Sequence, residues 1–513
     1  MTREIELKLT IPSDQIKEIA QLPLLKSLSI APPKKQKLYS IYYDTPDLLL
    51  RNQRCSLRIR RISKQWIQTI KSGGNITAGL HQHNESEVTL NKAQPDFIHL
   101  QHTGIINPAQ YHAVVKALKP IFITQFTRDT HTLKAEDGSI IEFCLDHGKI
   151  TADQLDDNIN EIELELKSGN PTQLFRFALE IAQLTDFPVQ LENVNKAEKG
   201  YRLFTGTRTP PTKALPIEIA TKTPLIDALS KILSGCLLQL TKNENGVLSS
   251  KNPEYLHQMR VAIRRLRSVF IIFKPLLVEQ HQSITFFEHE LKWLMHLLNP
   301  ARNWSVFTNE VLPPIITHFP NAKSIIAIRK LGQKQLNQYT QQVQTHLQSK
   351  RYLEFILKLN LWIYDLHHDI KRVSSLSIGS FSRSYLLDQH SALTNTEKLE
   401  KTKPATLHAL RIQIKKQRYA AEFFYSLYAK QVCFKRYVQL LAILQGALGS
   451  INDNYMVDEQ LESILSSQKQ KELALSIGVI QGWKAHVTTQ MKADLKNNWN
   501  KFLTMSPFQK NSN

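Results

Sequence analysis

The chain has 513 residues, of which 42% are hydrophobic, and carries a formal net charge of +20. This length exceeds what a single hydrophobic core usually supports, so we expect two or three domains. The four cysteines are far apart and lack C-x-x-C spacing, which argues against a disulfide framework or a zinc site. No apolar leader and no run of 18 apolar residues is found, so we expect a cytoplasmic protein without a membrane span.

The positive charge is concentrated in the C-terminal part. Residues 1–207 contain 25 Lys and Arg and 24 Asp and Glu, which leaves 40 basic and 21 acidic residues for the rest of the chain. Such an excess predicts a polyanionic partner: nucleic acid, an anionic membrane surface or polyphosphate. The alternative is a basic surface that only keeps the protein soluble.

The opening stretch, residues 4–9, alternates charged and apolar side chains. In a strand, Glu4, Glu6 and Lys8 would line one face and the three apolar residues between and after them the other. A solvated edge strand would have the same pattern, but the pattern recurs. Several strands with one charged and one apolar face predict a barrel with a polar interior. The recurrences are Arg58 and Arg60; Glu85 and Glu87; and Glu161, Glu163, Glu165 and Lys167.

The two parts of the chain are separated by a proline-rich segment. Residues 205–224 contain four prolines, which is typical of a linker. Strands dominate before this segment, with helices expected at residues 108–119 and 171–186, and helices dominate after it. We therefore predict domains at residues 1–205 and 224–505, a linker at 206–223 and a tail at 506–513.

The N-terminal motifs, taken in order, resemble the CYTH, or triphosphate tunnel metalloenzyme, superfamily over residues 3 to about 205. They are Glu4, Glu6 and Lys8 of E-x-E-x-K; Tyr42-Tyr43-Asp44-Thr45-Pro46; Leu57-Arg58-Ile59-Arg60; Thr69-Ile70-Lys71; Glu85 and Glu87; Asp146-His147-Gly148; residues 161–166; and residues 195–201.

This resemblance implies an α+β domain, an eight-stranded antiparallel barrel with flanking helices, whose tunnel binds a triphosphate. A triphosphate needs fixed cations, and divalent metal to neutralise developing charge. Carboxylates suit Mg²⁺ or Mn²⁺. The cations are Lys8, Arg58, Arg60, Lys71, Arg128 and Lys196; the metal ligands are Glu4, Glu6, Glu163 and Glu165; Glu85, Glu87 and Asp146 are tunnel carboxylates of open role.

We expect water to attack the terminal phosphoryl group without a covalent intermediate. By resemblance, the general base is Lys8, with Tyr43 nearby. Crowding by other cations could lower the pKa of Lys8 enough to make it neutral near pH 8. The alternative is that Lys8 only clamps phosphate.

Two features depart from the family. In the family, an arginine often stands two residues before the second E-x-E pair, and here that position is His83. A second histidine, His81, lies two residues before His83. Because residues 72–84 contain several glycines, we expect a loop there and no metal binding by these histidines. Asp146 could face the tunnel or only shape the turn at Gly148.

The C-terminal part contains an internal repeat. A histidine followed by basic residues at i+3, i+7 and i+10 occurs twice, 151 residues apart, so each predicted helix is basic on one face and apolar on the other. The residues are His257, Arg260, Arg264 and Arg267, then His408, Arg411, Lys415 and Arg418.

This repeat resembles the CHAD domain over residues 220 to about 505. The resemblance implies an all-α domain of two pseudo-symmetric helical bundles, whose basic faces converge on a surface that binds polyphosphate. A second family motif is intact as Leu448-Gly449-Ser450-Ile451-Asn452-Asp453. Its counterpart in the first repeat has Asn303 and Ser305 where acids are expected.

We therefore predict a metal-dependent inorganic triphosphatase with a polyphosphate-binding domain. A non-catalytic polyphosphate-binding protein, or an enzyme acting on thiamine triphosphate or cyclising ATP, is the alternative. Specific nucleic-acid recognition is not expected, because no aromatic residues are interleaved with the basic ones as stacking platforms. Nonspecific binding through phosphate contacts is expected to be salt-sensitive.

Overall fold

The computed structural model describes residues 2–77, 79–369, 377–395, 404–465 and 470–508. The chain divides into two compact units, Met1–Pro210 with His346–Asp365 and Pro211–Thr345 with Leu366–Asn513. The first change of unit, after Pro210, falls within the segment that we predicted as a linker. Among the described helices, none combines the length and hydropathy that a membrane-spanning segment needs.

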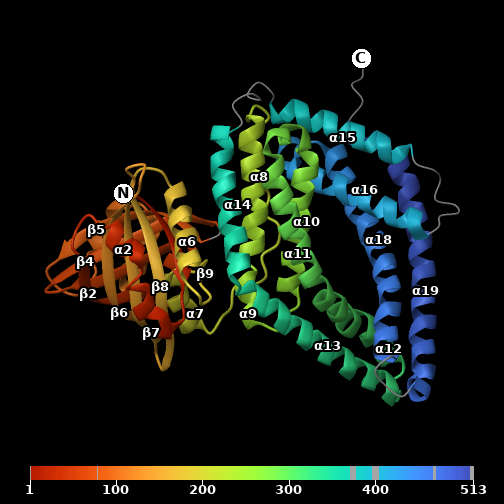
Figure 1. Cartoon of the computed structure of the whole chain (residues 1–513), viewed down its shortest axis with the longest axis horizontal. Helices are drawn as coiled ribbons and strands as arrows, with labels where there is room; N and C mark the ends of the chain where they lie inside the picture. The colour runs from red at the N-terminus through yellow and green to blue at the C-terminus, as the bar shows by residue number, and fades with distance from the viewer. Residues whose placement is uncertain (1, 78, 370–376, 396–403, 466–469, 509–513) are drawn as a thin grey trace. The chain divides into compact units, whose positions relative to one another are not determined.

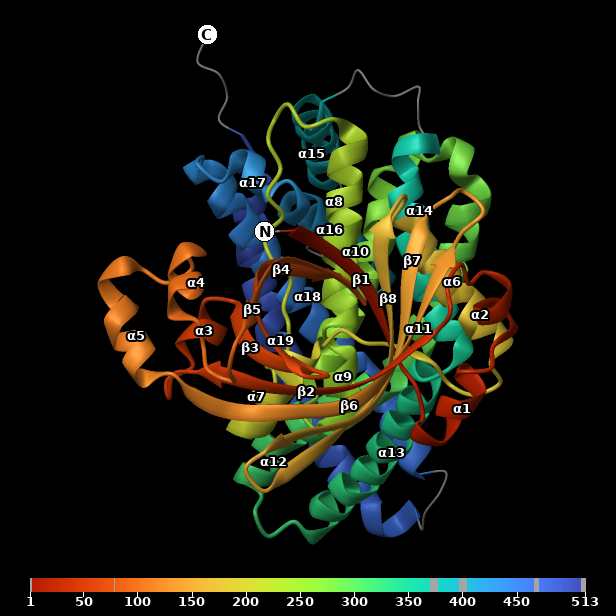
Figure 2. The same ribbon diagram turned by 90° about the vertical axis from the view of Figure 1, so that its left-hand side faces the viewer.

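Eight antiparallel strands of the N-terminal unit close into a barrel, as predicted (Figure 2). Around the barrel the order is β1, β5, β4, β3, β2, β6, β7 and β8, and β8 pairs again with β1. A two-residue strand, β9 (Gln190–Leu191), also pairs with β1. The barrel strands are β1 (Thr2–Thr10), β2 (Lys34–Asp44), β3 (Cys55–Ile62), β4 (Gln65–Thr77), β5 (Leu80–Leu90), β6 (Lys119–Lys134), β7 (Ile140–Ala152) and β8 (Leu155–Ser168).

The strand register turns the charged rows inward. Residues directly opposite each other in neighbouring strands present their side chains on the same face of the sheet. Lys8 lies opposite Glu163, and Glu6 lies opposite both Glu165 and His81. Leu7 and Leu9, which alternate with these residues, are fully buried in an apolar cluster with α6 (Thr172–Leu184) outside the barrel.

Short helices cover the rest of the outer surface. The helices expected at residues 108–119 and 171–186 are present in shorter form, as η2 with α5 and as α6. One side carries α3 (Leu49–Asn52), α4 (Phe97–His102), η2 (Pro108–Gln110) and α5 (Tyr111–Ala117); η1 (Ser13–Gln15), α1 (Ile16–Ile19) and α2 (Pro23–Ser27) precede β2.

Helix α7 (Lys196–Thr205) packs against residues that face the barrel interior. It begins at Asn195, whose side chain accepts the amide of Glu198, and ends before Gly206. Tyr201 joins Tyr42 and Phe122 in an apolar cluster built from interior-facing residues of β2, β6, β7 and β8. The helix therefore forms one wall of the interior and brings its N-terminal lysines to the tunnel carboxylates.

Asp44, in the Tyr-Asp-Thr-Pro motif, has a structural role. Its buried carboxylate accepts the backbone amides of Thr45, Leu50 and Arg51 and the hydroxyl of Tyr201. A carboxylate with four such partners fixes the start of α3 and joins it to α7.

The chain beyond Pro224 is helical, as predicted (Figure 1). The two longest helices, α18 and α19, lie side by side. The elements are α8 (Leu225–Thr241), α9 (Glu244–Ser249), α10 (Glu254–Ile272), η3 (Lys274–Leu276), η4 (Val278–Gln280), α11 (His281–Val306), the π-helical η5 (Phe307–Val311), α12 (Leu312–His318), α13 (Lys323–Leu347), α14 (Lys350–Asp369), α15 (Ile378–Thr394), α16 (Pro404–Phe423), α17 (Tyr425–Tyr428), α18 (Val432–Leu465) and α19 (Gln470–Leu503).

The predicted linker is partly anchored to the helical unit. Asn243 exchanges hydrogen bonds with both backbone groups of Thr212. Ser426 does the same with Ile219, which is buried. The segment from Thr212 to Ile219 therefore belongs structurally to the helical unit.

Candidate active site and basic helical surface

The centre of the barrel interior is Glu163, which contacts three cations. Lys8 and Arg128 donate short hydrogen bonds to its carboxylate, and Lys196 Nζ lies 2.9 Å from Oε1. Burial alone would raise the pKa of Glu163, but Lys196, Lys8 and Arg128 together hold it well below its usual value. Glu163 is therefore ionised at any ordinary pH.

Glu163 also belongs to a buried acidic trio with Asp146 and Glu161. One carboxylate oxygen from each lies within 4.8 Å of the others. Lys196 Nζ lies 2.6 Å from Asp146 and 2.5 Å from Glu161, and Arg128 makes a bidentate pair with Asp146 at 2.7 and 2.6 Å. Asp146 thus faces the interior. Glu161 is not among the predicted site residues, although its place in the alternating Glu161 to Glu165 run already indicated the inward face.

Lys8 is positioned as a cation. Its Nζ lies 3.0 Å from Glu6 and bonds to Glu163. Burial would lower the pKa of Lys8, but Glu163, Glu6 and Glu161 outweigh it and raise the pKa well above the usual value. The expectation of a lowered pKa is therefore wrong, because we considered the neighbouring cations and not the carboxylates that lie closer.

Tyr42, and not Tyr43, faces the interior. Arg58 donates a hydrogen bond to the Tyr42 hydroxyl. Burial alone would raise the pKa of Tyr42, but Arg58 and Arg60 outweigh burial, so the pKa is lowered. Tyr43 packs with Leu57 and Leu50 in an apolar cluster on the outside of the barrel. The structure therefore does not bring Tyr43 to Lys8, because adjacent strand residues point to opposite faces.

Arg60 is a buried cation without a carboxylate partner among the described residues. Its Nε donates to Ser40 at 3.0 Å, and its guanidinium lies over the ring of Phe126. Burial, then Arg58 and Arg128, lower the pKa of Arg60 to about 10. Asp146 attracts this guanidinium from beyond ion-pair distance, so Arg60 itself is free to pair with an anion.

The remaining predicted residues lie toward the β4, β5 and β8 walls. Lys71 contacts Glu4 and lies 3.6 Å from Glu85, which in turn lies 3.5 Å from Arg58. Glu87 accepts the hydroxyl of Thr69. Glu165 accepts a hydrogen bond of 2.7 Å from Lys167.

The four predicted metal ligands do not form one cluster. Glu6 and Glu163 are bridged by Lys8, whereas Glu4 is paired with Lys71 and Glu165 with Lys167. In the described part of the chain, Glu163 instead groups with the other two acids of the acidic trio, and Glu6 groups with two histidines.

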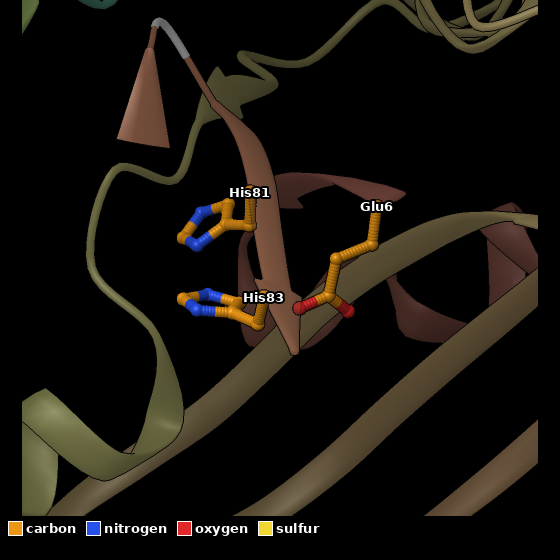
Figure 3. A group of neighbouring side chains, drawn as sticks. All are labelled: Glu6, His81 and His83. Carbon is orange, nitrogen blue, oxygen red and sulfur yellow. The ribbon is translucent and has the colours of Figure 1, made fainter. Parts of the chain in front are cut away.

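Those histidines, His81 and His83, lie in β5 and not in a loop, so that expectation is wrong (Figure 3). Strand pairing with β1 places them beside Glu6, and overrides the flexibility that the nearby glycines suggested. Burial and then Lys8 lower the pKa of His81 to about 4, and burial and then Lys71 lower that of His83. Both imidazoles are therefore neutral near pH 7.

In the helical unit, the basic faces of α10 and α16 converge. Arg264 Nε donates to the hydroxyl of Tyr419, on α16, at 3.2 Å. Burial lowers the pKa of Lys415 to about 8, and Arg411 on its own helix and three arginines of α10 contribute. Of the predicted residues, Arg267 and His408 are exposed, whereas His257, Arg260, Arg264, Arg411, Lys415 and Arg418 are half-buried. We call this set the basic helical surface.

Arg302 of α11 adds to the basic helical surface. Burial and then Arg302 lower the pKa of His257 to about 4. Arg302 forms an ion pair of 2.9 Å with Glu310, which lies in the π-helical η5. Glu310 is therefore an acid close in sequence to Asn303 and Ser305, the two positions where acids were expected. Asp453 lies in α18, but its side chain lies outside the described part of the structure.

Comparison with known families assigns both parts of the chain. Residues 2–201 match the CYTH domain and residues 231–462 match the CHAD domain. The chain is therefore a CYTH domain followed by a CHAD domain.

Two relatives are informative. An inorganic triphosphatase of Haemophilus influenzae is 36% identical over 204 residues, which cover 40% of this chain and 55% of that protein; the match thus spans about half the length of the relative. The crystal structure of the CHAD domain from the plant Ricinus communis superposes with a TM-score of 0.51 and 26% identity, over 59% of this chain and 99% of that chain.

Proposed function

We propose that the CYTH domain hydrolyses inorganic triphosphate to diphosphate and phosphate, and that the CHAD domain binds polyphosphate through the basic helical surface. The similarity to an inorganic triphosphatase supports a phosphoanhydride hydrolase of this type. Unmodified triphosphate is the simplest substrate, because the charged residues of the barrel interior match phosphate oxygens.

The observation that carries this proposal is the excess positive charge around Arg60. A buried guanidinium with one hydroxyl partner, crowded by Arg58 and Arg128, is unfavourable unless an anion neutralises it. A triphosphate bound along Arg58, Arg60 and Arg128 would supply that charge through bidentate contacts. The acidic trio lies next to Arg128 and would face the same anion.

The acidic trio would hold a divalent metal ion in place of the Lys196 ammonium, which contacts all three carboxylates. Its three ligand atoms are buried hard oxygens within 4.8 Å of one another, and Mg²⁺ and Mn²⁺ prefer such ligands. When bound, Mg²⁺ or Mn²⁺ supplies charge neutralisation at the phosphate oxygens and acidifies a water molecule. We assign this role to Asp146, Glu161 and Glu163, and keep Glu4 and Glu6 as further carboxylates facing the substrate.

For Lys8 we propose the role of a phosphate clamp. Its raised pKa keeps it protonated, so it can donate to phosphate oxygens and cannot take a proton from water. Lys196, whose pKa is raised by Asp146, Glu161 and Glu163 despite its burial, serves the same purpose from α7. Water attacks the terminal phosphorus, the bond to the bridging oxygen breaks, diphosphate leaves, and the proton lost by the water passes to a phosphate oxygen.

A substitution at Lys8 separates the clamp from the general base. Arginine cannot lose its proton at ordinary pH, so it can replace a clamp but not a base. We expect Lys8→Arg to retain more than about a tenth of the turnover and Lys8→Met to lose at least about a hundredfold. Equal inactivation of both variants, with unchanged melting temperatures, would contradict the clamp.

The proposed function is tested by measuring phosphate release from triphosphate, long-chain polyphosphate, ATP and thiamine triphosphate with Mg²⁺ or Mn²⁺, in parallel with polyphosphate binding. We expect metal-dependent release from triphosphate that is abolished in Glu163→Gln. Binding of polyphosphate without hydrolysis of any substrate would favour the non-catalytic alternative, and preference for thiamine triphosphate or cyclisation of ATP would favour an organic substrate. Duplex DNA as a competitor tests the nucleic-acid alternative.

A further inference from the structure

Glu6, His81 and His83 form a second group of potential ligands, distinct from the acidic trio. One ligand atom from each residue lies within 4.8 Å of the others, and Figure 3 shows both imidazole rings projecting from β5 beside the Glu6 carboxylate. Glu6 of β1 lies directly opposite His81 of β5, and His83 lies two residues further along β5, opposite Glu4. The geometry thus places two nitrogens and a carboxylate together on two rigid strands.

Each imidazole has one nitrogen bonded to a backbone carbonyl. His81 Nε2 lies 2.8 Å from the carbonyl oxygen of Glu192, and His83 Nδ1 lies 3.3 Å from that of Gly73. A carbonyl only accepts, so the bonded nitrogen of each ring carries the proton and the other nitrogen presents a lone pair. A hydrogen bond of this kind fixes the tautomer and orientation of metal-binding histidines.

The two lone-pair nitrogens are buried, and neither has a hydrogen-bond partner among the described residues. They are Nδ1 of His81, a residue with no exposed surface, and Nε2 of His83. A histidine that only fills the core normally satisfies both ring nitrogens, because a buried unpaired acceptor costs about 1–3 kcal/mol. Two such acceptors, on rings that each bring one nitrogen within 4.8 Å of a Glu6 carboxylate oxygen, indicate a ligand that accepts lone pairs.

The donor set selects the class of ion. Two imidazoles and one carboxylate suit zinc and the neighbouring first-row transition metals, whereas Mg²⁺ prefers oxygen ligands. Glu6 retains coordination capacity, because a carboxylate has about four lone-pair sites and Lys8 uses one oxygen.

We propose that Glu6, His81 and His83 bind one divalent transition-metal ion, such as Zn²⁺ or Co²⁺. The site shares the barrel interior with the proposed triphosphatase centre but does not rest on triphosphate hydrolysis. It gives the domain two metal sites of different chemistry: an all-oxygen acidic trio and a nitrogen-containing site on β1 and β5.

The test is a titration of the chelator-treated full-length protein with Co²⁺, followed by its visible absorption and by competition with Zn²⁺ and with Mg²⁺. We expect one Co²⁺ with nitrogen-ligand bands, displaced by equimolar Zn²⁺ but not by a large excess of Mg²⁺. His83→Gln and His83→Arg should each weaken binding at least about tenfold. His147→Gln is the matched control, because this exposed histidine bonds only to Asn160 among the described residues.

A spectrum unchanged in His83→Gln, or Co²⁺ lost in Glu161→Gln but kept in His83→Gln, would overturn the proposal. Melting curves of His83→Gln and His83→Arg separate loss of the ligand from loss of the fold. Triphosphate hydrolysis is measured separately with Mg²⁺ alone. Co²⁺ binding without hydrolysis would contradict the proposed function only, and hydrolysis without histidine-dependent Co²⁺ binding would contradict this inference only.

Discussion

At the scale of single residues, the barrel interior separates charges that are satisfied from charges that are not. Glu163 has three cationic partners, whereas Arg60 has one neutral hydroxyl. A charged group with all its partners stabilises the fold. A cation crowded by other cations lowers the stability of the fold but strengthens the binding of an anion. At Arg60, the charge that favours the binding of an anion therefore lowers the stability of the free protein.

We predict that Arg60→Met weakens triphosphate binding and stabilises the free protein. The folded pKa of Arg60, about 10, lies below its usual value of 12.5, so below pH 10 its charge costs folding free energy in full. Methionine keeps an apolar stem over Phe126 without the charge. We expect KM to rise at least about tenfold and the free energy of unfolding to rise by about 1 kcal/mol or more.

The matched control is Arg61→Met. Arg61 is exposed on the outer face, where it stacks over Trp66, so KM should stay within about twofold of the parent. Steady-state kinetics and urea unfolding provide both readouts. A lower stability of Arg60→Met would show that the guanidinium has stabilising partners besides Ser40 and the ring of Phe126.

At the scale of elements, α7 connects the fold to the site. Gly200 lies against Phe122, and a Cβ built there would lie 2.2 Å from a ring carbon. The same helix carries Lys196, which contacts the acidic trio. The contact between helix and barrel therefore sets the position of a substrate-facing lysine.

Gly200→Ala is predicted to destabilise the CYTH domain and to reduce turnover. Alanine gains about 1 kcal/mol of helix propensity, but the clash with a buried ring costs about 1–3 kcal/mol and shifts the helix. Thermal melting and phosphate release measure the two effects. Gly446→Ala in α18 is the control with the opposite sign, because nothing lies within 4 Å of a Cβ there.

A second prediction at this scale concerns α10 and α16. Lys415 has a pKa of about 8, lowered by burial and by Arg411, Arg264, Arg260 and Arg267. Because it loses its charge as the pH rises through about 8, polyphosphate affinity should fall between pH 7 and pH 9. Lys415→Gln should bind more weakly at pH 7 and lose most of this pH dependence. Affinities are compared at constant ionic strength, and a parallel decline in both proteins would contradict the assignment.

The elements and their faces were largely predictable from sequence. The period-two rows of Glu4, Glu6 and Lys8 and of Glu161 to Glu165 predicted inward faces, and helical spacing predicted the basic stripes of α10 and α16. The identity of neighbours was not predictable, because strand register depends on tertiary pairing. Register explains why the contact of His81 with Glu6 could not be predicted. The inward face of Glu161 was predictable from the alternation of Glu161 to Glu165, whereas Tyr43 was expected near Lys8 only by resemblance, and the glycines near His81 and His83 suggested a loop.

At the scale of the whole molecule, the two anion sites that we propose differ in their pattern of charge. The charged barrel interior alternates cations with carboxylates, and the basic helical surface is almost wholly cationic. The first can take a short, highly charged anion together with metal, and the second a long one. The unequal charge of the two parts of the sequence is consistent with this division.

The two sites are predicted to differ in their response to salt. Polyphosphate binding to a half-exposed cationic surface releases counterions, so affinity should fall at least about tenfold between about 50 and 200 mM salt. Contacts in the buried interior are screened less, so KM for triphosphate should change less than about threefold. Similar salt dependence of both would indicate that they share one surface.

The closure of the barrel through β1 has a consequence for synthesis of the chain. Lys8 pairs with Glu163, and its carbonyl accepts the amide of Glu192. Strand β1 therefore cannot complete its pairing until more than 180 further residues have been synthesised. Until then its charged row remains in water, at little cost, while Leu7 and Leu9 are unprotected. These two leucines, and not the charged residues that alternate with them, should attract chaperones to the nascent chain.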